Sequence, residues 1–246
     1  MPTPWDGQQQ ALVEVGRVAA VLRYPVKSMA GEPLDRAELG WQGLRGDRRW
    51  AFTRAGADGS GFPWLTLREN PAMATYAPVI SDSARPDGSP VAVTTPEGEV
   101  LDVRDPRLAA RLGHGARAFK NDRGTFDSMA VSVVTAQSIA SLGCLVGHEL
   151  NPVRFRPNLV VDAPEGGPYP EDAWTGAVLA VGTARLRVDR PDTRCAVVDV
   201  DPSTGTCGTK VLRAIPRDRR ARLGVYGTTV APGTIAVGDA VMLLRE

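Results

Sequence analysis

Apolar residues recur along this chain in short runs, and glycine, proline and aspartate interrupt them. Short runs that are rich in β-branched residues and bounded by turn formers predict strands. Eight strands are predicted on this basis, at residues 18–24, 48–53, 91–95, 130–134, 159–162, 177–181, 184–189 and 237–244. The tetrapeptide Val181-Gly182-Thr183-Ala184 predicts a tight connection between two of them. The pattern indicates a fold built mainly from strands.

Two segments have features of helices instead. Residues 106–112 follow an acidic residue and precede a glycine, which suits a short helix. In residues 135–146 apolar positions form one stripe, Thr135 can cap the N-terminus and Gly147 can end the helix. Cys144 lies within this second helix among apolar residues, and we predict that it is structural.

This balance of elements is typical of the α+β class, mainly β, with a barrel-like arrangement and a few short helices. The largely polar stretch 115–125 contains Lys120, Arg123 and Gly124, and such stretches commonly separate two lobes. We therefore expect a first lobe at residues 12–118 and a second at residues 119–246.

Charge and length limit the classes of partner. The chain has 246 residues, with 29 Lys and Arg against 28 Asp and Glu, so its net charge is +1. A field this weak does not favour a nucleic acid polymer or a membrane as partner. Any anionic ligand must therefore be held by a local cluster of basic side chains.

The cysteines and the N-terminus indicate the compartment. Three cysteines without a Cys-x-x-Cys pair argue against a disulfide framework, and two histidines are too few for a typical zinc site. The first residues lack the basic and apolar regions of a signal peptide, and no apolar run reaches the ~20 residues that span a bilayer. We expect a soluble, cytoplasmic protein.

The tripeptide Thr193-Arg194-Cys195 is the most informative local sequence. It places a thiol beside a fixed positive charge where a predicted strand gives way to a loop. A guanidinium favours the thiolate, which binds soft metals or acts as a nucleophile. A lone cysteine can equally be a small buried apolar residue, so the tripeptide alone leaves both roles open.

Charged and hydroxyl side chains also gather beside other predicted strand ends. Among them, the cations that could neutralise a phosphate are Lys27, Arg48, Arg156 and Arg194, and the groups that could bind a heteroaromatic ring are Ser28, Ser128 and Asn158. The alternative for each arginine is an ordinary surface ion pair. Arg45 and Arg49 are assigned to that alternative, because strand alternation around Arg48 points Arg49 elsewhere.

Taken in order, these motifs resemble the MOSC family, which takes its name from the C-terminal domain of molybdenum cofactor sulfurase. The matching sequences are Tyr24-Pro25-Val26-Lys27-Ser28, Gly46-Asp47-Arg48-x-Trp50, Phe155-Arg156-Pro157-Asn158, Glu171-Asp172-x-Trp174, Arg194-Cys195 with Asp201-Pro202-x-Thr204-Gly205, and Pro232-Gly233-x-Ile235-x-Val237-Gly238-Asp239. The resemblance runs from about residue 18 to residue 244. It implies a two-lobe β-barrel architecture, with a MOSC N-terminal-like β-barrel lobe at 12–118 and a cofactor-binding MOSC domain at 119–246.

The resemblance also implies a site. Cys195 falls on the family's ligand to molybdenum, and Asp127 falls on an acidic position beside the metal, where it could move protons or hold a water. Capping a turn is the alternative for Asp127. The positions that would hold the pterin and phosphate of the molybdenum cofactor (Mo-molybdopterin) are Lys27, Ser28, Arg48, Ser128, Arg156, Asn158, Thr193, Arg194 and Tyr226. Met129 departs from the smaller residues of the amidoxime-reducing members.

Three functions are compatible with these features. The first is a reductase of small N-hydroxylated substrates, such as amidoximes, hydroxylamines and N-hydroxylated bases, supplied with electrons by a separate ferredoxin- or flavoprotein-type protein. The second is a sulfur transferase with a persulfide on Cys195 and Cys207 as a resolving thiol. The third is a molybdenum cofactor carrier. The likeness to amidoxime-reducing proteins and bacterial hydroxylaminopurine reductases favours the first.

Overall fold

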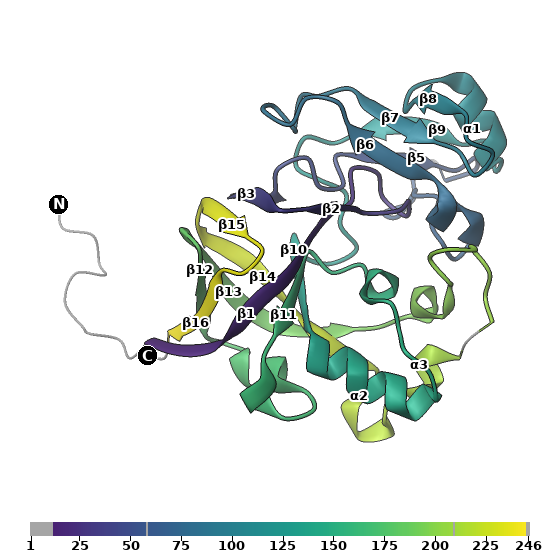
Figure 1. Cartoon of the computed structure of the whole chain (residues 1–246). Coiled ribbons are helices and arrows are strands. Elements are labelled where there is room, and N and C mark those ends of the chain that lie inside the picture. The colour runs from purple at the N-terminus through teal and green to yellow at the C-terminus, as the bar shows by residue number, and fades with distance from the viewer. Residues whose placement is uncertain (1–11, 58, 209, 245–246) are drawn as a thin grey trace.

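The largest sheet of the protein closes on itself (Figure 1). The computed structural model describes residues 12–57, 59–208 and 210–244. The strands of this sheet, in spatial order, are β11 (Leu159–Asp162), β10 (Val131–Thr135), β14 (Arg222–Ala231), β13 (Ala184–Thr193), β12 (Val178–Val181), β16 (Ala240–Leu244), β1 (Leu12–Arg23) and β2 (Glu32–Leu34). Because β11 also pairs with β1, the first seven form a closed barrel, and β2 extends from β1.

Side-chain alternation fills this barrel. Along β13, Ala184, Leu186 and Val188 are buried, whereas Arg185 and Arg187 between them are exposed. This is the period of two that a strand with one apolar face requires. The buried residues form one core with those of the neighbouring strands. β10 and β11 are parallel, because α2 (Ala136–Val146) crosses over between them.

A second lobe, which we call the small-sheet lobe, lies above the barrel in Figure 1. It contains two sheets, one of β5 (Trp50–Thr53) with β9 (Arg117–Lys120) and one of β6 (Ala77–Ile80), β7 (Val91–Thr94) and β8 (Val100–Asp102), together with α1 (Pro106–Leu112) and the 3₁₀ turn η1 (Pro71–Thr75). It has its own apolar core. Val26 and Val200, which come from loops beside the barrel, also pack into that core and so join the two lobes.

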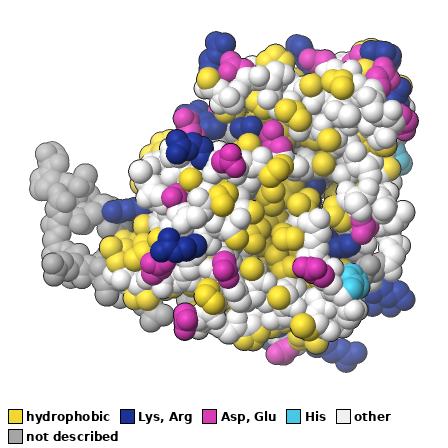
Figure 2. Space-filling view, viewed as in Figure 1, with side chains coloured by type: hydrophobic (Ala, Val, Ile, Leu, Met, Phe, Trp, Pro, Cys, Tyr) yellow, Lys and Arg dark blue, Asp and Glu magenta, His cyan; other side chains and the backbone are white. Residues whose placement is uncertain are grey.

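The remaining elements are short. A sheet of β15 (Gly233–Ala236), β3 (Arg36–Gly40) and β4 (Gly43–Leu44) lies beside the barrel. A third core lies under α2 and α3 (Val211–Ala214). The other 3₁₀ turns are η2 (Pro152–Phe155), η3 (Pro164–Gly166), η4 (Pro170–Trp174), η5 (Ala196–Asp199) and η6 (Arg217–Arg219). On the outer face of the small-sheet lobe, basic and acidic side chains are interspersed (Figure 2), and Arg107 and Arg111 pair with Glu99 there.

The mainly β, barrel-containing fold is confirmed, and all eight predicted strands are present, β11 with the predicted ends and the others with shifted ends. The clearest shifts are that Arg48 lies outside β5 and that residues 237–239 form a turn before β16. Both predicted helices are present, and Thr135 caps α2 through its bond from the Ser138 backbone N–H.

One prediction about these helices is wrong. Cys144 is exposed, because it lies on the solvent side of α2 rather than on its buried stripe.

Some predictions stay open. The predicted division between residues 118 and 119 falls within β9 and stays a prediction. The N-terminal segment, where we expected no signal peptide, lies within residues 1–11 and so outside the described chain. Among the residues that the structure describes, no helix has the length and apolar composition needed to cross a membrane.

Candidate functional site

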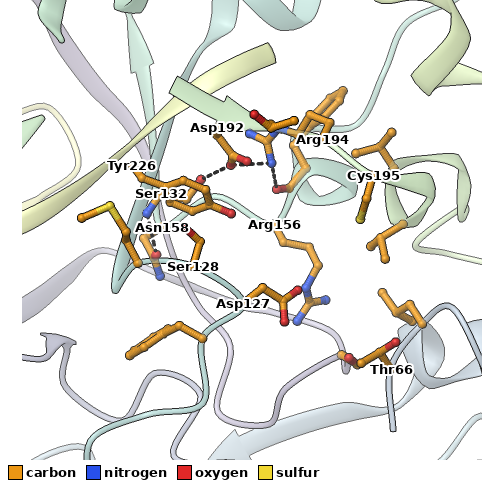
Figure 3. Close-up of a pocket in the computed structure, with 18 of the residues that line it drawn as sticks. Thr66, Asp127, Ser128, Ser132, Arg156, Asn158, Asp192, Arg194, Cys195 and Tyr226 are labelled. Carbon is orange, nitrogen blue, oxygen red and sulfur yellow. Dashed lines mark hydrogen bonds and ion pairs between the residues drawn. The ribbon is translucent and has the colours of Figure 1, made fainter. Parts of the chain in front are cut away.

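A cavity of about 530 Å³ opens where the small-sheet lobe meets the ends of β13 and β14. Figure 3 shows it with its lining side chains. All eleven residues predicted from the sequence line it, namely Lys27, Ser28, Arg48, Asp127, Ser128, Arg156, Asn158, Thr193, Arg194, Cys195 and Tyr226. They come from six separate segments of the chain, which the fold brings to one place.

The backbone around this cavity is strained. Ser28, Arg48 and Arg156 have φ values of 67°, 52° and 53°, in the left-handed region that side chains other than glycine rarely occupy. Such conformations cost about 1–3 kcal/mol each and concentrate at functional sites. All three residues line the cavity, so the fold maintains this strain where it positions two arginines and a serine.

Tyr24 lies between two of those arginines. Its ring centroid is 4.6 Å from the guanidinium carbon of Arg48 and 4.4 Å from that of Arg156. The tyrosine is fully buried, and burial raises its pKa to about 12, so the ring stays neutral. An aromatic face attracts guanidinium groups. The ring therefore stabilises the guanidinium groups of two arginines that line the cavity.

Main-chain carbonyls fix the guanidinium groups further. Arg48 Nη2 donates to the Arg156 carbonyl (3.0 Å), and Arg156 Nη1 donates to that of Met29 (2.7 Å). Arg194 Nη1 donates to the Phe155 carbonyl (2.8 Å), and its Nε donates to that of Leu223 (2.7 Å). These bonds orient the three side chains. Arg48 is also paired with the Asp47 carboxylate, whereas Arg156 has no carboxylate within 4.0 Å in the described chain.

Asp192 is the carboxylate at the top of the cavity, where Figure 3 joins it to Ser132 and Arg194. Its Oδ2 lies 2.9 Å from Arg194 Nη1 and accepts from Ser132 Oγ at 3.2 Å. Burial raises the pKa of Asp192, and burial together with that carboxylate raises the pKa of Tyr226. Asp192 thus anchors Arg194 at the cavity wall.

Three guanidinium nitrogens of the lining arginines remain without partners. Arg154 Nε, Arg156 Nη2 and Arg194 Nη2 are buried, and none has a hydrogen-bond partner within the described part of the chain. Burial, with the nearby charge of Arg48, lowers the pKa of Arg156 to about 10. A buried donor without a partner is costly, and charged donors cost more. The unpartnered donors of these arginines therefore make the cavity lining suited to an anionic ligand.

Lys27 and Asp127 form an ion pair at the side of the cavity. Lys27 Nζ binds the Asp127 carboxylate and also donates to the Thr125 carbonyl at 3.2 Å. Burial lowers the pKa of Lys27. Burial raises the pKa of Asp127, but the charge of Lys27 outweighs this and holds it below the usual range. Asp127 is thus ionised at neutral pH, and no backbone N–H among the described residues donates to it, as the turn-capping alternative would require.

Cys195 follows the end of β13 and begins η5. Its side chain is partly exposed, and its sulfur points toward the cavity (Figure 3). Arg68 Nη2 from the small-sheet lobe donates to this sulfur at 3.3 Å. The thiol therefore contacts a cation from the opposite lobe. The side chain of neighbouring Arg194 instead donates to main-chain carbonyls. The cation that contacts the Cys195 sulfur is therefore Arg68, and not the arginine that precedes the cysteine in the sequence.

The other predicted residues have mixed roles. Ser128 accepts from Arg190, and Ser28 is buried while Thr193 is exposed. Asn158 lines the cavity, but its amide bonds serve the barrel: Oδ1 accepts from the Ser132 N–H (3.1 Å), and Nδ2 donates to the Leu22 carbonyl (3.2 Å). Arg49 does not line the cavity and pairs with Asp87, but its side chain is buried, so this is not the surface ion pair that was expected.

Sequence reasoning missed several lining residues, chiefly Thr66, Arg68, Ser132, Arg190, Asp192 and Arg222. Asp192 directly precedes Thr193-Arg194-Cys195, and that position could have drawn attention to it. Arg68 had no such signal, because it is 127 residues away from Cys195 in the chain.

Comparisons with known proteins agree with this fold. A family model described as the MOSC domain matches residues 116–242, and one described as the MOSC N-terminal beta barrel domain matches residues 15–132. Human mitochondrial amidoxime-reducing component 1 is 25% identical over 98% of this chain and 87% of that protein. Molybdenum cofactor sulfurase 2 of Culex quinquefasciatus is 37% identical, but over only 30% of this chain and 9% of that protein.

The YuaD protein from Bacillus subtilis superposes with a TM-score of 0.51 and 11% identity over 97% of this chain and 100% of that one, a likeness of fold alone. The fold and the cavity thus define a β-barrel protein with a cationic site beside one thiol. The chain belongs to the MOSC family.

Proposed function

We propose that this protein is a molybdenum-cofactor-dependent reductase of N-hydroxylated compounds, with Cys195 as the protein's ligand to the metal. One observation carries the proposal: the cavity that exposes the Cys195 thiol is also lined by Arg156 and Arg194, each with a buried guanidinium nitrogen that has no partner among the described residues. Members of the MOSC family commonly bind the molybdenum cofactor, and the amidoxime-reducing components are distant relatives over nearly the whole chain.

The cavity residues fit the phosphate of that cofactor. We call Lys27, Arg48, Arg156 and Arg194 the deep cationic cluster. Arginine donates in a fork that matches phosphate oxygens, and charge-assisted bonds of this kind are about twice as strong as neutral ones. A phosphate held by these arginines would supply acceptors for their unpartnered donors and would reduce the repulsion between Arg48 and Arg156. Ser28, Ser128, Thr193 and Tyr226 offer hydroxyl groups to the pterin.

The thiol fits the metal. Thiolate is a soft ligand, and the Arg68 guanidinium places a positive charge directly beside the Cys195 sulfur. When bound, the cofactor supplies the two-electron redox chemistry that the side chains of the protein lack. The chain itself orients the substrate and limits access of water.

The proposed reaction breaks one N–O bond. Reduction of an amidoxime to an amidine consumes two electrons and two protons and releases water. The Asp127 carboxylate and the Lys27 ammonium lie at the cavity wall as an acceptor and a donor of protons. Asp127, about half exposed, can also hold a water there. Electrons come, in this proposal, from a separate ferredoxin- or flavoprotein-type protein in the cytoplasm.

The direct test is turnover by cofactor-loaded protein with a chemical reductant. Reduced methyl viologen removes the need for the partner protein, and benzamidoxime and 6-hydroxylaminopurine serve as substrates. We expect N–O reduction by wild type and at least a ~100-fold loss in Cys195→Ser, since each 1.4 kcal/mol of lost stabilisation costs a factor of ten. Metal-loaded wild type that reduces neither compound would refute the reductase.

Sulfur transfer and cofactor delivery remain distinguishable outcomes. Sulfur transfer with a resolving thiol needs Cys207 near Cys195, but Cys207 is exposed and does not line the cavity. Cyanide-releasable sulfur on Cys195 after exposure to a cysteine desulfurase would favour that function. Rapid cofactor exchange with an apo-enzyme, without turnover, would favour the carrier.

A further inference from the structure

Two exposed arginines line the cavity from opposite lobes, and we call Arg68 and Arg222 the rim arginines. Arg68 precedes η1 in the small-sheet lobe, and its Nη2 touches the Cys195 sulfur. Arg222 begins β14, and its Cα is paired with Thr193, two residues before Cys195. Both side chains line the cavity, and both residues are exposed.

The rim arginines have free donors. Within the described chain neither has a carboxylate within 4.0 Å, the side chain of Arg222 makes no hydrogen bond, and Arg68 makes only the bond to sulfur. By contrast, Asp127, the exposed acid of the cavity, is already paired with Lys27.

The charge of the whole lining exceeds what the cofactor phosphate needs. Eight Lys and Arg side chains line the cavity against two Asp side chains, Asp127 and Asp192. Lys27, Arg48, Arg154 and Arg194 are already paired with Asp127, Asp47, Asp201 and Asp192. Within the described chain the lining cations without a carboxylate partner are therefore Arg68, Arg156, Arg190 and Arg222. A phosphate monoester carries about two negative charges at neutral pH, so positive charge remains uncompensated when the cofactor phosphate is bound.

We propose that Arg68 and Arg222 bind a carboxylate or phosphate group of the substrate, so that the protein prefers anionic N-hydroxylated compounds over neutral ones. This inference rests on the proposed function and names its substrate class. Forked guanidinium donors suit either anion. Phe126 and Met129 line the same cavity and offer apolar contact to the planar part of such a substrate.

Three ligands that share one ring separate charge from shape: neutral benzamidoxime, 4-carboxybenzamidoxime and the cationic 4-(aminomethyl)benzamidoxime. Their dissociation constants are measured by calorimetry on oxidised, cofactor-loaded protein without reductant, so binding is read without turnover. We expect the carboxylate to bind about tenfold tighter than the neutral compound, and the cation to bind more weakly than either. Raising the ionic strength reduces the preference.

Arg222→Gln is the decisive variant, because the Arg222 side chain makes no hydrogen bond or ion pair with any other described residue. It is expected to bring the carboxylate-to-neutral affinity ratio close to one. Arg213→Gln is the matched control, since Arg213 is an exposed arginine of α3 that does not line the cavity, and this variant should keep the ratio. Arg68→Gln should raise KM for the carboxylate more than for the neutral compound. Loss of the contact with the Cys195 sulfur alone would change KM for both compounds to the same extent.

Each outcome has one meaning. Equal affinity for the three ligands, no binding of any of them, or a preference that survives both rim variants overturns the inference. Turnover of benzamidoxime without a charge preference overturns the inference and leaves the reductase standing. Charge-dependent binding at the rim without any N–O reduction overturns the reductase and leaves the anion site standing.

Discussion

The deep cationic cluster and the rim arginines carry the same charge but are held in different ways. Arg156 and Arg194 are fixed by carbonyl groups and aromatic rings before any ligand arrives. Arg68 and Arg222 are exposed and have no carboxylate partner within the described residues. Ordering a long side chain costs up to about 2 kcal/mol. In the deep cluster the folded protein already orders the side chains, whereas at the rim the ligand must order them when it binds.

This difference suggests different ligands for the two regions. A preorganised, strained and buried cluster suits a resident group that stays bound, because its geometry does not need to adapt. Exposed side chains with free donors suit a ligand that enters and leaves. We therefore assign the cofactor to the deep cluster and the charge of the substrate to the rim, and the variants below test that assignment.

The largest expected effect is on the deep cluster. Arg156→Met removes a guanidinium whose Nη2 has no partner in the described chain, and we expect cofactor affinity to fall about 100-fold through loss of a charge-assisted phosphate contact. Pterin and molybdenum content of the purified protein measure this. Arg49→Met is the control: Arg49 is a buried arginine nearby, but it pairs with Asp87 away from the cavity. Equal loss of cofactor in both variants would contradict the assignment.

A buried acid that resembles a site residue should prove structural. Glu171 is fully buried under α2, where its Oε2 accepts from Thr135 Oγ1 (2.5 Å) and Ser138 Oγ (2.7 Å). We expect Glu171→Gln to lower the free energy of unfolding by about 1–2 kcal/mol, because these bonds lose their charge.

Urea unfolding measures the stability of Glu171→Gln, and pterin content should match wild type. Asp172→Asn is the control, since its ion pair with Arg219 is partly exposed, and we expect an effect below about 1 kcal/mol. Loss of cofactor from Glu171→Gln at full stability would show that this residue belongs to the site.

Phosphate should stabilise the cofactor-free protein. The pKa of Arg156 is lowered to about 10, so its charge destabilises the folded state at neutral pH, on the order of 3 kcal/mol, and this penalty is relieved as pH rises above 10. An anion that offsets part of the penalty should raise Tm by about 4 °C. Thermal unfolding in phosphate and in chloride at equal ionic strength provides the comparison. If phosphate raised the Tm of Arg156→Met by the same amount, the anion would bind at a site other than Arg156.

The smallest effect concerns Asp127. Its pKa is held low by Lys27, so the ion pair stabilises the folded state above the ordinary pKa of an aspartate, and this stability is lost as pH falls through the lowered value. Because Asp127 is about half exposed, we expect Asp127→Asn to cost only about 0.5 kcal/mol at pH 7. Urea unfolding of variant and wild type should converge in acid. If the difference in unfolding free energy between variant and wild type were the same at every pH, the ion pair would not be its cause.

Local patterns predicted much of the fold. Thr135 and Gly147 bound α2 as expected, and the tight connection at Gly182 joins β12 to β13. The pattern missed β14, in which Gly224 and Gly227 interrupt the apolar alternation. Gly227 is needed there because a Cβ would lie 2.5 Å from the Arg187 carbonyl of β13. That requirement arises from strand packing, which a single segment does not reveal.

The site was predictable where its residues lie in motifs, and not where the fold alone assembles it. Arg156 and Cys195 were found through their neighbours in sequence. Arg68 was not, because its role depends on how the small-sheet lobe packs against the barrel. The left-handed backbone of Arg48 was also hidden, since its surroundings in sequence predicted a strand.

The most direct test of the account is metal and pterin analysis of wild type purified from a host that makes the molybdenum cofactor. The account predicts molybdenum and pterin in equal amounts, stoichiometric with the chain, and X-ray absorption at the molybdenum edge with one sulfur neighbour fewer in Cys195→Ser. Folded protein that contains neither, from cells that load another molybdenum enzyme, would contradict it.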